Sequence, residues 1–305
     1  MSAARMHADE AEIDAGLVRR LIADQFPQWA ALPVERVPSG GTVNAVFRLG
    51  GELAVRMPLT GGGAKDVDLE HTHLPRLAAV LPLPVPEPVA KGEPGGGYPY
   101  PWSVCRWLPG TILPPDAGVA APGPLAGQLA GFVNAMRAAD PAGAPASYRS
   151  EPLADRDAGT RDALARLVPE DGVDVPAVTA AWEAALRAPA YAGAPVWLHA
   201  DLSPGNILLT DDGRLGGVID FGCMGLGEPA VDLIAAWNLF TGPAREAFRA
   251  ALAGADGRGV DEAAWARGRG WALSISLIQL PYYRHTNPAM VASSKFVIDE
   301  VLADG

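Results

Sequence analysis

Three polar side chains in the second half of the chain have the types and spacing that phosphoryl transfer requires. Asp201 and Asn206 lie five residues apart in the string HADLSPGN, and Asp220 follows nineteen residues after Asp201 in the string IDFG. A carboxylate can orient an attacking hydroxyl and accept its proton, while an amide oxygen and a second carboxylate can hold Mg²⁺ on phosphates. Asp201, Asn206 and Asp220 together therefore predict a site with a catalytic carboxylate and a place for Mg²⁺.

The residues around these side chains predict the elements that must position them. An apolar run at 196–199 indicates a strand that leads into the polar loop, and a second strand is expected at 207–210. After a turn at 211–213, a third apolar run at 215–219 ends just before the last acidic residue. A loop followed by a hairpin is therefore expected to present all three polar groups.

The first 110 residues have the pattern of a small sheet. Apolar residues at helical spacing predict a leading helix over 10–26. Short apolar runs broken by glycines predict antiparallel strands, with Gly50-Gly51 as a hairpin turn. Strands are expected at 32–37, 45–49, 53–57, 85–90 and 103–108, with a helix at 65–80. This region is therefore expected to form a five-stranded sheet with one important helix.

The composition changes after residue 110. A stretch rich in Pro and Gly at 111–124 is either a linker or the start of a helical domain. Helical patterns follow at 124–138, 176–188, 229–240, 243–253, 261–280 and 288–302. We expect an α+β protein with a small, mostly antiparallel lobe over 1–108, a larger, mainly helical lobe over 109–305, and a cleft between them.

Charge and cysteine content exclude several classes of partner. The chain carries 24 basic and 35 acidic side chains, a net charge of −11, which argues against nucleic acid and anionic membranes as partners. Its 2 cysteines form no metal-binding or disulfide pattern and fit a reducing cytosol. The N-terminus lacks an apolar leader, and the most apolar stretch, 271–280, is too short to span a bilayer. A cytoplasmic protein without a membrane partner is expected.

The string HADLSPGN followed by IDFG resembles the catalytic and metal-binding loops of the aminoglycoside phosphotransferase family, which are distant relatives of protein kinases. The segments LEHTHLPRLAAVLPLPVPEP, PWSVCRWLPG and GLGEPAVDL also look like this family, so the resemblance covers most of the chain. It implies a protein-kinase-like fold of two lobes, with Asp201 as the catalytic group and Asn206 and Asp220 as magnesium ligands. It also implies ATP or GTP as phosphoryl donor, Mg²⁺ as cofactor and a hydroxyl of a small molecule as acceptor.

The resemblance assigns nucleotide contacts to the first lobe. It implies that Gly40, Gly41 and Thr42 cover the nucleotide phosphates with their backbone N–H groups. It implies that the Arg106 carbonyl and the Leu108 N–H bind adenine in the connection between the lobes.

One position departs from the family pattern. Arg56 stands where the family usually places a lysine that contacts phosphate, and Glu70 on the following helix is the expected ion-pair partner that aims it. Arginine supplies the charge but not the shape of an ammonium group. Lys65 is the alternative phosphate contact.

The resemblance gives four further residues structural roles. His199 is expected to support the catalytic loop by hydrogen bonding, and Asp232 to hold the backbone of that loop. Cys105 and Cys223 are expected to be packed thiols, although Cys105 would face the adenine pocket.

The acceptor is expected to be a small molecule and not a protein. Only twelve residues separate Asp220 from Asp232, whereas protein kinases insert an activation segment in this interval. The resemblance suggests an antibiotic of the aminoglycoside, macrolide or nucleoside type, with a choline-like or sugar-like metabolite as the alternative. The candidate acceptor contacts in the helical lobe are Trp237, Trp271, Tyr282, Tyr283, His285 and Asn287.

Two other function classes are alternatives to phosphoryl transfer. A nucleotide-binding protein without transfer activity is suggested by the replaced lysine, although such a protein has no need to keep Asp201, Asn206 and Asp220 together. A Rossmann-type enzyme is excluded, since no strand–helix–strand pattern carries GxGxxG.

Overall fold

The computed structural model describes residues 10–38, 43–115, 118–119, 123–252 and 259–304. Within the first lobe it contains a five-stranded antiparallel sheet in the order β1-β2-β3-β5-β4, as expected from the sequence. The turn between the second and third strands contains Gly50, whose φ of 60° lies in the left-handed region that glycine adopts without strain. The elements are α1 (Ala15–Gln25), η1 (Pro27–Trp29), β1 (Val34–Arg36), β2 (Asn44–Leu49), β3 (Leu53–Pro58), α2 (Gly61–Ala78), β4 (Pro88–Gly92) and β5 (Trp102–Arg106).

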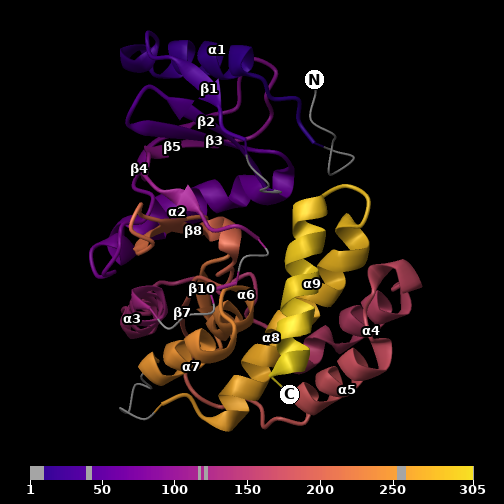
Figure 1. Cartoon of the computed structure of the whole chain (residues 1–305). Coiled ribbons are helices and arrows are strands. Elements are labelled where there is room, and N and C mark those ends of the chain that lie inside the picture. The colour runs from indigo at the N-terminus through magenta and orange to yellow at the C-terminus, as the bar shows by residue number, and fades with distance from the viewer. Residues whose placement is uncertain (1–9, 39–42, 116–117, 120–122, 253–258, 305) are drawn as a thin grey trace.

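The two faces of this sheet have different surroundings. Alternating residues of β3 and β5, among them Val55 and Val104, pack with α1 in one hydrophobic cluster. Because successive side chains of a strand point to opposite faces, Arg56, Ser103 and Cys105 belong to the other face. That face is turned toward α2 and the second lobe (Figure 1).

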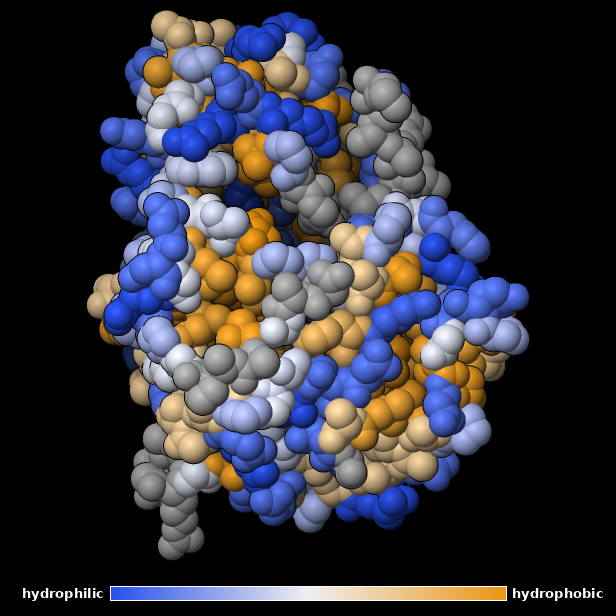
Figure 2. All heavy atoms as spheres, in the orientation of Figure 1, coloured by the Kyte–Doolittle hydropathy of each residue, from blue (hydrophilic) through white to orange (hydrophobic). Residues whose placement is uncertain are grey.

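Helix α2 is packed into the core of the C-terminal lobe. Glu70 in the middle of the helix is buried, and Leu74 and Leu77 near its C-terminal end pack into the large hydrophobic cluster of that lobe. In Figure 1 the helix lies between the sheet and the helical lobe. The surface is recessed where the two lobes meet (Figure 2), at the place of the expected cleft.

The second lobe combines short strands with helices. β6 (Thr111–Ile112) pairs with β8 (Ile207–Leu209), which pairs with β9 (Leu215–Val218), and β7 (Val196–Leu198) pairs with β10 (Gly225–Gly227). The α-helices are α3 (Pro124–Ala138), α4 (Asp157–Ala165), α5 (Val175–Leu186), α6 (Ala235–Asn238), α7 (Gly242–Ala251), α8 (Glu262–Tyr283) and α9 (Pro288–Ala303). Short 3₁₀ turns are η2 (Leu153–Arg156), η3 (Pro169–Asp171), η4 (Pro204–Asn206) and η5 (Val231–Ile234).

Most predicted elements are present within a few residues of their expected bounds, with three differences. The stretch after residue 110 starts the second lobe, because β6 joins the β8–β9 hairpin, so the linker alternative is wrong for its first residues. The helix predicted at 229–240 is divided into η5 and α6. Helix α4 and strand β10 were not predicted. Over the described residues, no helix is long and apolar enough to cross a membrane.

Candidate active site

The predicted catalytic loop follows β7 and is fixed by a buried carboxylate. Asp232 on η5 is fully buried and accepts hydrogen bonds from the backbone N–H groups of His199 at 3.0 Å and Ala200 at 2.7 Å. Ala200 has a φ of 65°, which is costly for a residue other than glycine, at about 1–3 kcal/mol. The two bonds to Asp232 thus hold a strained backbone directly before Asp201, as expected from the sequence.

His199 supports this loop through both nitrogens of its ring. Nδ1 accepts from the backbone N–H of Asp201 at 3.2 Å, so Nε2 carries the proton and donates to the carbonyl oxygen of Ile219 at 3.1 Å. The ring is fully buried, with its centroid 4.6 Å from that of Phe221 and 6.3 Å from that of Phe132. These contacts fit the structural role predicted for His199.

Asp201 and Asn206 lie side by side. The Asn206 side-chain amide donates to the Asp201 carbonyl oxygen at 2.8 Å and to Asp201 Oδ2 at 3.0 Å. The backbone carbonyl oxygen of Asn206 accepts a hydrogen bond from the N–H of Ile219, the residue before Asp220, at 3.0 Å. The loop and the hairpin therefore bring the three predicted polar groups to one place.

Asp220 faces the predicted phosphate contact. Its φ of 65° is again left-handed. Arg56 Nη2 donates to Asp220 Oδ1 at 2.9 Å, and Arg56 Nη1 pairs with Glu70 Oε2. Glu70 Oε1 also accepts from the backbone N–H of Phe221 at 3.2 Å. The predicted ion pair of Arg56 and Glu70 is thus present, and it extends to the predicted metal loop.

The charges around Arg56 are unbalanced. Burial opposes the Arg56 charge, yet the carboxylates of Glu70 and Asp220 raise the pKa of Arg56 above its ordinary value. Burial raises the pKa of the Asp220 carboxyl, and Arg56 opposes that shift. Asp66 lies one turn before Glu70 on α2, and burial, together with Glu70 and Asp220, raises the pKa of Asp66 to about 7. Two carboxylates thus pair with one guanidinium, and the carboxyl of Asp66 adds a third acidic group to the cluster.

Asp66 was not singled out by sequence reasoning. A Cβ placed on Gly222 would lie 2.7 Å from Asp66 Oδ2, so this carboxylate rests against the backbone that follows Asp220. The available signal is its spacing of four residues before Glu70, which puts both side chains on one face of α2.

The donor set fits magnesium. Carboxylate and amide oxygens, here from Asp220 and Asn206, are hard ligands, and Mg²⁺ commonly binds through one or two carboxylates together with substrate phosphates. The excess of carboxylates around Arg56 would also be offset by a divalent cation. In the described part of the chain, no three His, Cys, Asp or Glu side chains are grouped so that they could hold a metal ion by themselves.

A second arginine contacts the catalytic loop and was not predicted. Arg149 Nη1 donates to Asp201 Oδ1 at 3.0 Å and to the carbonyl oxygen of Ala200. Burial opposes its charge, but Asp201 raises the pKa of Arg149 above its ordinary value. The residue precedes Asp201 by 52 positions and belongs to no motif, so only the fold places it in the site.

The other predicted nucleotide contacts are placed as follows. Gly40, Gly41 and Thr42 lie outside the described residues. Arg106 ends β5, where its N–H donates to the Glu87 carbonyl at 2.9 Å, and half-buried Leu108 follows on the connection to the second lobe.

Two further predictions in this region concern Lys65 and the cysteines. Lys65 is exposed on α2, whereas Arg56 is buried against Asp220, so the geometry favours Arg56 as the phosphate contact. Burial raises the pKa of Cys105 to about 11 and that of Cys223 to about 12, as expected for packed thiols.

The candidate acceptor contacts divide into buried and exposed residues. Trp237 and Trp271 are fully buried in the core, and Tyr283 is 9% exposed. Asn287 is buried and caps α9 by accepting from the N–H of Met290 at 3.1 Å. Direct contact with an acceptor is therefore open to Tyr282 and His285, which are exposed.

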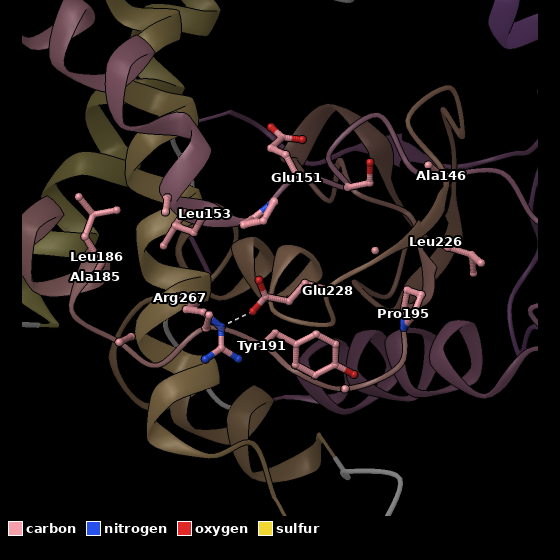
Figure 3. A pocket seen from close by; sticks show the side chains of 17 residues that line it. Ala146, Glu151, Leu153, Ala185, Leu186, Tyr191, Pro195, Leu226, Glu228 and Arg267 are labelled. Carbon is pink, nitrogen blue, oxygen red and sulfur yellow. Dashed lines mark hydrogen bonds and ion pairs between the residues drawn. The ribbon is translucent and has the colours of Figure 1, made fainter.

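A cavity of about 620 Å³ lies elsewhere in the second lobe (Figure 3). It is lined by parts of 146–154, 185–195 and 226–228, and the buried ion pair of Glu228 and Arg267 lies at one side of it. Asp201, Asn206 and Asp220 are not among its lining residues. This cavity is therefore separate from the predicted catalytic centre.

Comparison with known proteins agrees with this geometry. The sequence pattern of the phosphotransferase enzyme family matches residues 34–271. No curated protein matches the chain. Among solved structures, the GDP and kanamycin complex of APH(2")-IIia is similar, with a TM-score of 0.74 and 22% identity over 94% of this chain and 99% of that one.

Two further solved structures have the same overall fold. Macrolide 2'-phosphotransferase type I aligns with a TM-score of 0.63 and 18% identity over 94% of this chain and 97% of its own. The ADP-bound aminoglycoside phosphotransferase APH(2'')-Ib aligns with a TM-score of 0.57 and 16% identity over 95% and 97% of the two chains. The expected kinase-like fold of a small sheet lobe and a helical lobe is thus confirmed.

Proposed function

Because the chain belongs to the phosphotransferase enzyme family, we propose that it transfers the terminal phosphoryl group of ATP or GTP to a hydroxyl of a small molecule. The observation that carries this proposal is the convergence of Asp201, Asn206 and Asp220 beside the Arg56–Glu70 ion pair. Transfer of a phosphoryl group from one oxygen to another requires a carboxylate, an amide and a correctly positioned cation.

Each group has a distinct task in the proposed reaction. Asp201 accepts the hydrogen bond of the acceptor hydroxyl and takes its proton as the acceptor oxygen bonds to the terminal phosphorus, while the bond from that phosphorus to the bridging oxygen breaks and the nucleoside diphosphate leaves. Asn206 and Asp220 would hold Mg²⁺, which when bound offsets the charge of the phosphate oxygens. Arg56, aimed by Glu70, donates to the phosphates through its planar fork.

We propose an antibiotic as the acceptor. The similar structures include a kanamycin complex and a macrolide phosphotransferase, and these names support hydroxylated antibiotics as the first compounds to test. A choline-like or sugar-like metabolite is the alternative acceptor. The donor is ATP or GTP, since one neighbour holds ADP and another GDP.

The test is a panel of acceptors with Mg–ATP and with Mg–GTP. Kanamycin, gentamicin, a macrolide, a nucleoside antibiotic, choline and simple sugars are incubated with the protein, and products are detected by a mass gain of one phosphoryl group. Phosphorylation of any panel member that is lost in Asp201→Asn supports the proposal. Tight binding of Mg–nucleotide without transfer to any acceptor and without nucleotide hydrolysis would favour the inactive nucleotide-binding alternative.

A further inference from the structure

We propose that Arg149 is a positioning residue that fixes the Asp201 carboxylate and the strained peptide before it. This inference rests on the proposed function, in which Asp201 meets the acceptor hydroxyl. The guanidinium group of Arg149 donates to Asp201 Oδ1 at 3.0 Å and to the Ala200 carbonyl oxygen. The Arg149 side chain is 11% exposed, so water competes little for these bonds.

The two oxygens of Asp201 receive different donors. Oδ1 accepts from Arg149 at 3.0 Å, and Oδ2 accepts from the Asn206 amide at 3.0 Å. One donor on each oxygen fixes the plane of the carboxylate, while each oxygen retains a second lone-pair direction for the hydroxyl of an acceptor. The carboxylate, whose side chain is 32% exposed, is thus oriented before an acceptor arrives.

Arg149 also completes the support of Ala200. Asp232 accepts a hydrogen bond from the N–H of Ala200, and Arg149 donates one to the carbonyl oxygen of Ala200. A residue in the left-handed region keeps that conformation only when its surroundings hold it. The arginine therefore supports both the backbone that carries Asp201 and the carboxylate itself.

The segment that carries Arg149 is anchored to the chain just after the predicted metal loop. Ser147 Oγ donates to the Cys223 carbonyl at 2.8 Å and accepts from the Arg149 N–H at 3.1 Å. The Ser147 N–H donates to the Leu226 carbonyl at 2.9 Å. A Cβ placed on Gly225 would lie 2.5 Å from the Ser147 nitrogen, so the two backbones pack closely. Arg149 thereby joins the catalytic loop to the segment that follows Asp220.

Both bonds come from one nitrogen of Arg149, Nη1, whose direction the planar guanidinium fixes. A lysine ammonium could supply a charge and donors beside Asp201, but its flexible stem does not fix the direction of those bonds. A methionine would fill a similar volume without donating. A comparison of arginine, lysine and methionine at position 149 therefore separates the effects of hydrogen-bond geometry, charge and packing.

The experiment compares Arg149→Lys and Arg149→Met with a matched control, Arg156→Met. Arg156 lies in the same segment, but its guanidinium pairs with Glu151 at 3.0 Å and donates to Ser274 Oγ at 2.9 Å instead of contacting the loop that carries Asp201. Activity is measured as phosphate release from Mg–ATP with water in place of an acceptor. Nucleotide affinity is measured separately by calorimetry.

We expect Arg149→Met to lower kcat about 100-fold with nucleotide Kd changed by less than about twofold, since a misplaced catalytic group costs rate and not nucleotide binding. The kcat of Arg149→Lys should be roughly tenfold higher than that of Arg149→Met. The kcat of Arg156→Met should stay within about threefold of the parent value. An unchanged kcat in Arg149→Met, or an equal loss in the control, would overturn the inference. If Arg149→Met does not fold, the same comparison is made with Arg149→Lys.

Amide hydrogen exchange gives a readout that does not depend on activity. Residues 199–206 of the nucleotide-free protein should exchange faster in Arg149→Met than in the parent, and not in Arg156→Met. Exchange that is unchanged at 199–206 in Arg149→Met contradicts the positioning role. If the parent transfers phosphate neither to water nor to any acceptor, the proposed function fails, while the exchange experiment still decides the inference about Arg149.

Discussion

The two halves of the candidate site are held in different ways. The proposed catalytic loop is fixed inside one lobe, since Asp232 and Arg149 bond to it from buried positions in the second lobe and His199 supports it from within. The proposed phosphate side is assembled across the two lobes, because Arg56 comes from the sheet and Glu70 from α2, and they meet the Asp220 loop of the second lobe. The proposed catalytic group is therefore preorganised by folding, whereas the proposed phosphate contacts depend on how the lobes meet.

The largest effect is expected from Asp232→Ala, which removes the support of the preorganised half. Two buried backbone N–H groups would lose their acceptor, and each such loss costs about 1–3 kcal/mol, so unfolding free energy should fall by about 2–6 kcal/mol. Urea unfolding measures this change. Asp171→Ala is the control, because Asp171 is also buried but pairs with Arg284. The Asp171→Ala variant should lose stability but keep nucleotide hydrolysis. An equal loss of hydrolysis in Asp171→Ala and Asp232→Ala would contradict a specific role for Asp232 in the loop.

The next effect concerns the half assembled across the lobes. Arg56→Ala should lower kcat/KM for the nucleotide by about 10- to 100-fold, and Glu70→Ala should do so by releasing Arg56. Because the two residues act as a pair, the double variant should lose less than the sum of the single losses in free energy. Lys65→Ala is the matched control. Parental kinetics in Arg56→Ala with a crippled Lys65→Ala would transfer the phosphate contact to Lys65.

Sequence patterns and the family resemblance predicted most residues in both halves of the site. The order of strand, loop and hairpin around Asp201, Asn206 and Asp220 follows from sequence-adjacent patterns, and the resemblance supplied the strand-to-helix pair of Arg56 and Glu70. Arg149 was not predicted, because 52 residues separate it from Asp201 and its contact exists only in the folded chain.

The missed elements have the same cause. β10 has the sequence GLG, with weak strand preference, and forms because it pairs with β7. Helix α4 has few apolar residues and is held by packing against α8, where Thr160 bonds Ser274 at 2.7 Å. Tertiary context, which a local pattern does not contain, decides these segments.

A smaller effect tests the charge imbalance at Arg56. Burial, together with Glu70 and Asp220, raises the pKa of Asp66 to about 7, above an unfolded value of 3.8. The folded protein then binds more protons than the unfolded chain between these values, so the Asp66 contribution to stability falls as pH rises from about 4 to 7. Asp66→Asn should remove this penalty, raising the unfolding free energy at pH 8 on the order of 1 kcal/mol after solvent screening and leaving it nearly unchanged near pH 4. Urea unfolding without magnesium or nucleotide checks the sign, and a stability loss at pH 8 would contradict it.

The smallest expected effect concerns the acceptor side of the catalytic loop. Tyr148 is 77% exposed, and its ring centroid lies 5.8 Å from the guanidinium carbon of Arg149, which contacts Asp201. An acceptor ring can rest on this face, so Tyr148→Ala should raise the acceptor KM by a few fold, or about 0.5–1.5 kcal/mol, with kcat little changed. Tyr282→Ala is the comparison, since Tyr282 is 53% exposed on α8. A larger rise of the acceptor KM in Tyr282→Ala than in Tyr148→Ala would place the acceptor against α8.

Salt adds a test of the acceptor's charge. With a net charge of −11, the protein should attract an amine-bearing acceptor, whose kcat/KM would fall with added salt more steeply than that of a neutral analogue. Salt-independent kinetics with a preferred neutral acceptor would instead assign the acidity to solubility.

The separation of tasks between Asp201 and Asp220 is tested most directly by calorimetric titration of Mg–ATP into Asp201→Asn and Asp220→Ala, beside phosphate-transfer rates. Asp201→Asn should lose transfer by at least about 100-fold and keep the parental nucleotide Kd within about twofold, because this carboxylate faces the acceptor. Asp220→Ala should weaken magnesium-dependent binding by about tenfold or more as well as turnover, because it would hold the ion on the phosphates. Equal losses of nucleotide affinity in the two variants would contradict the account.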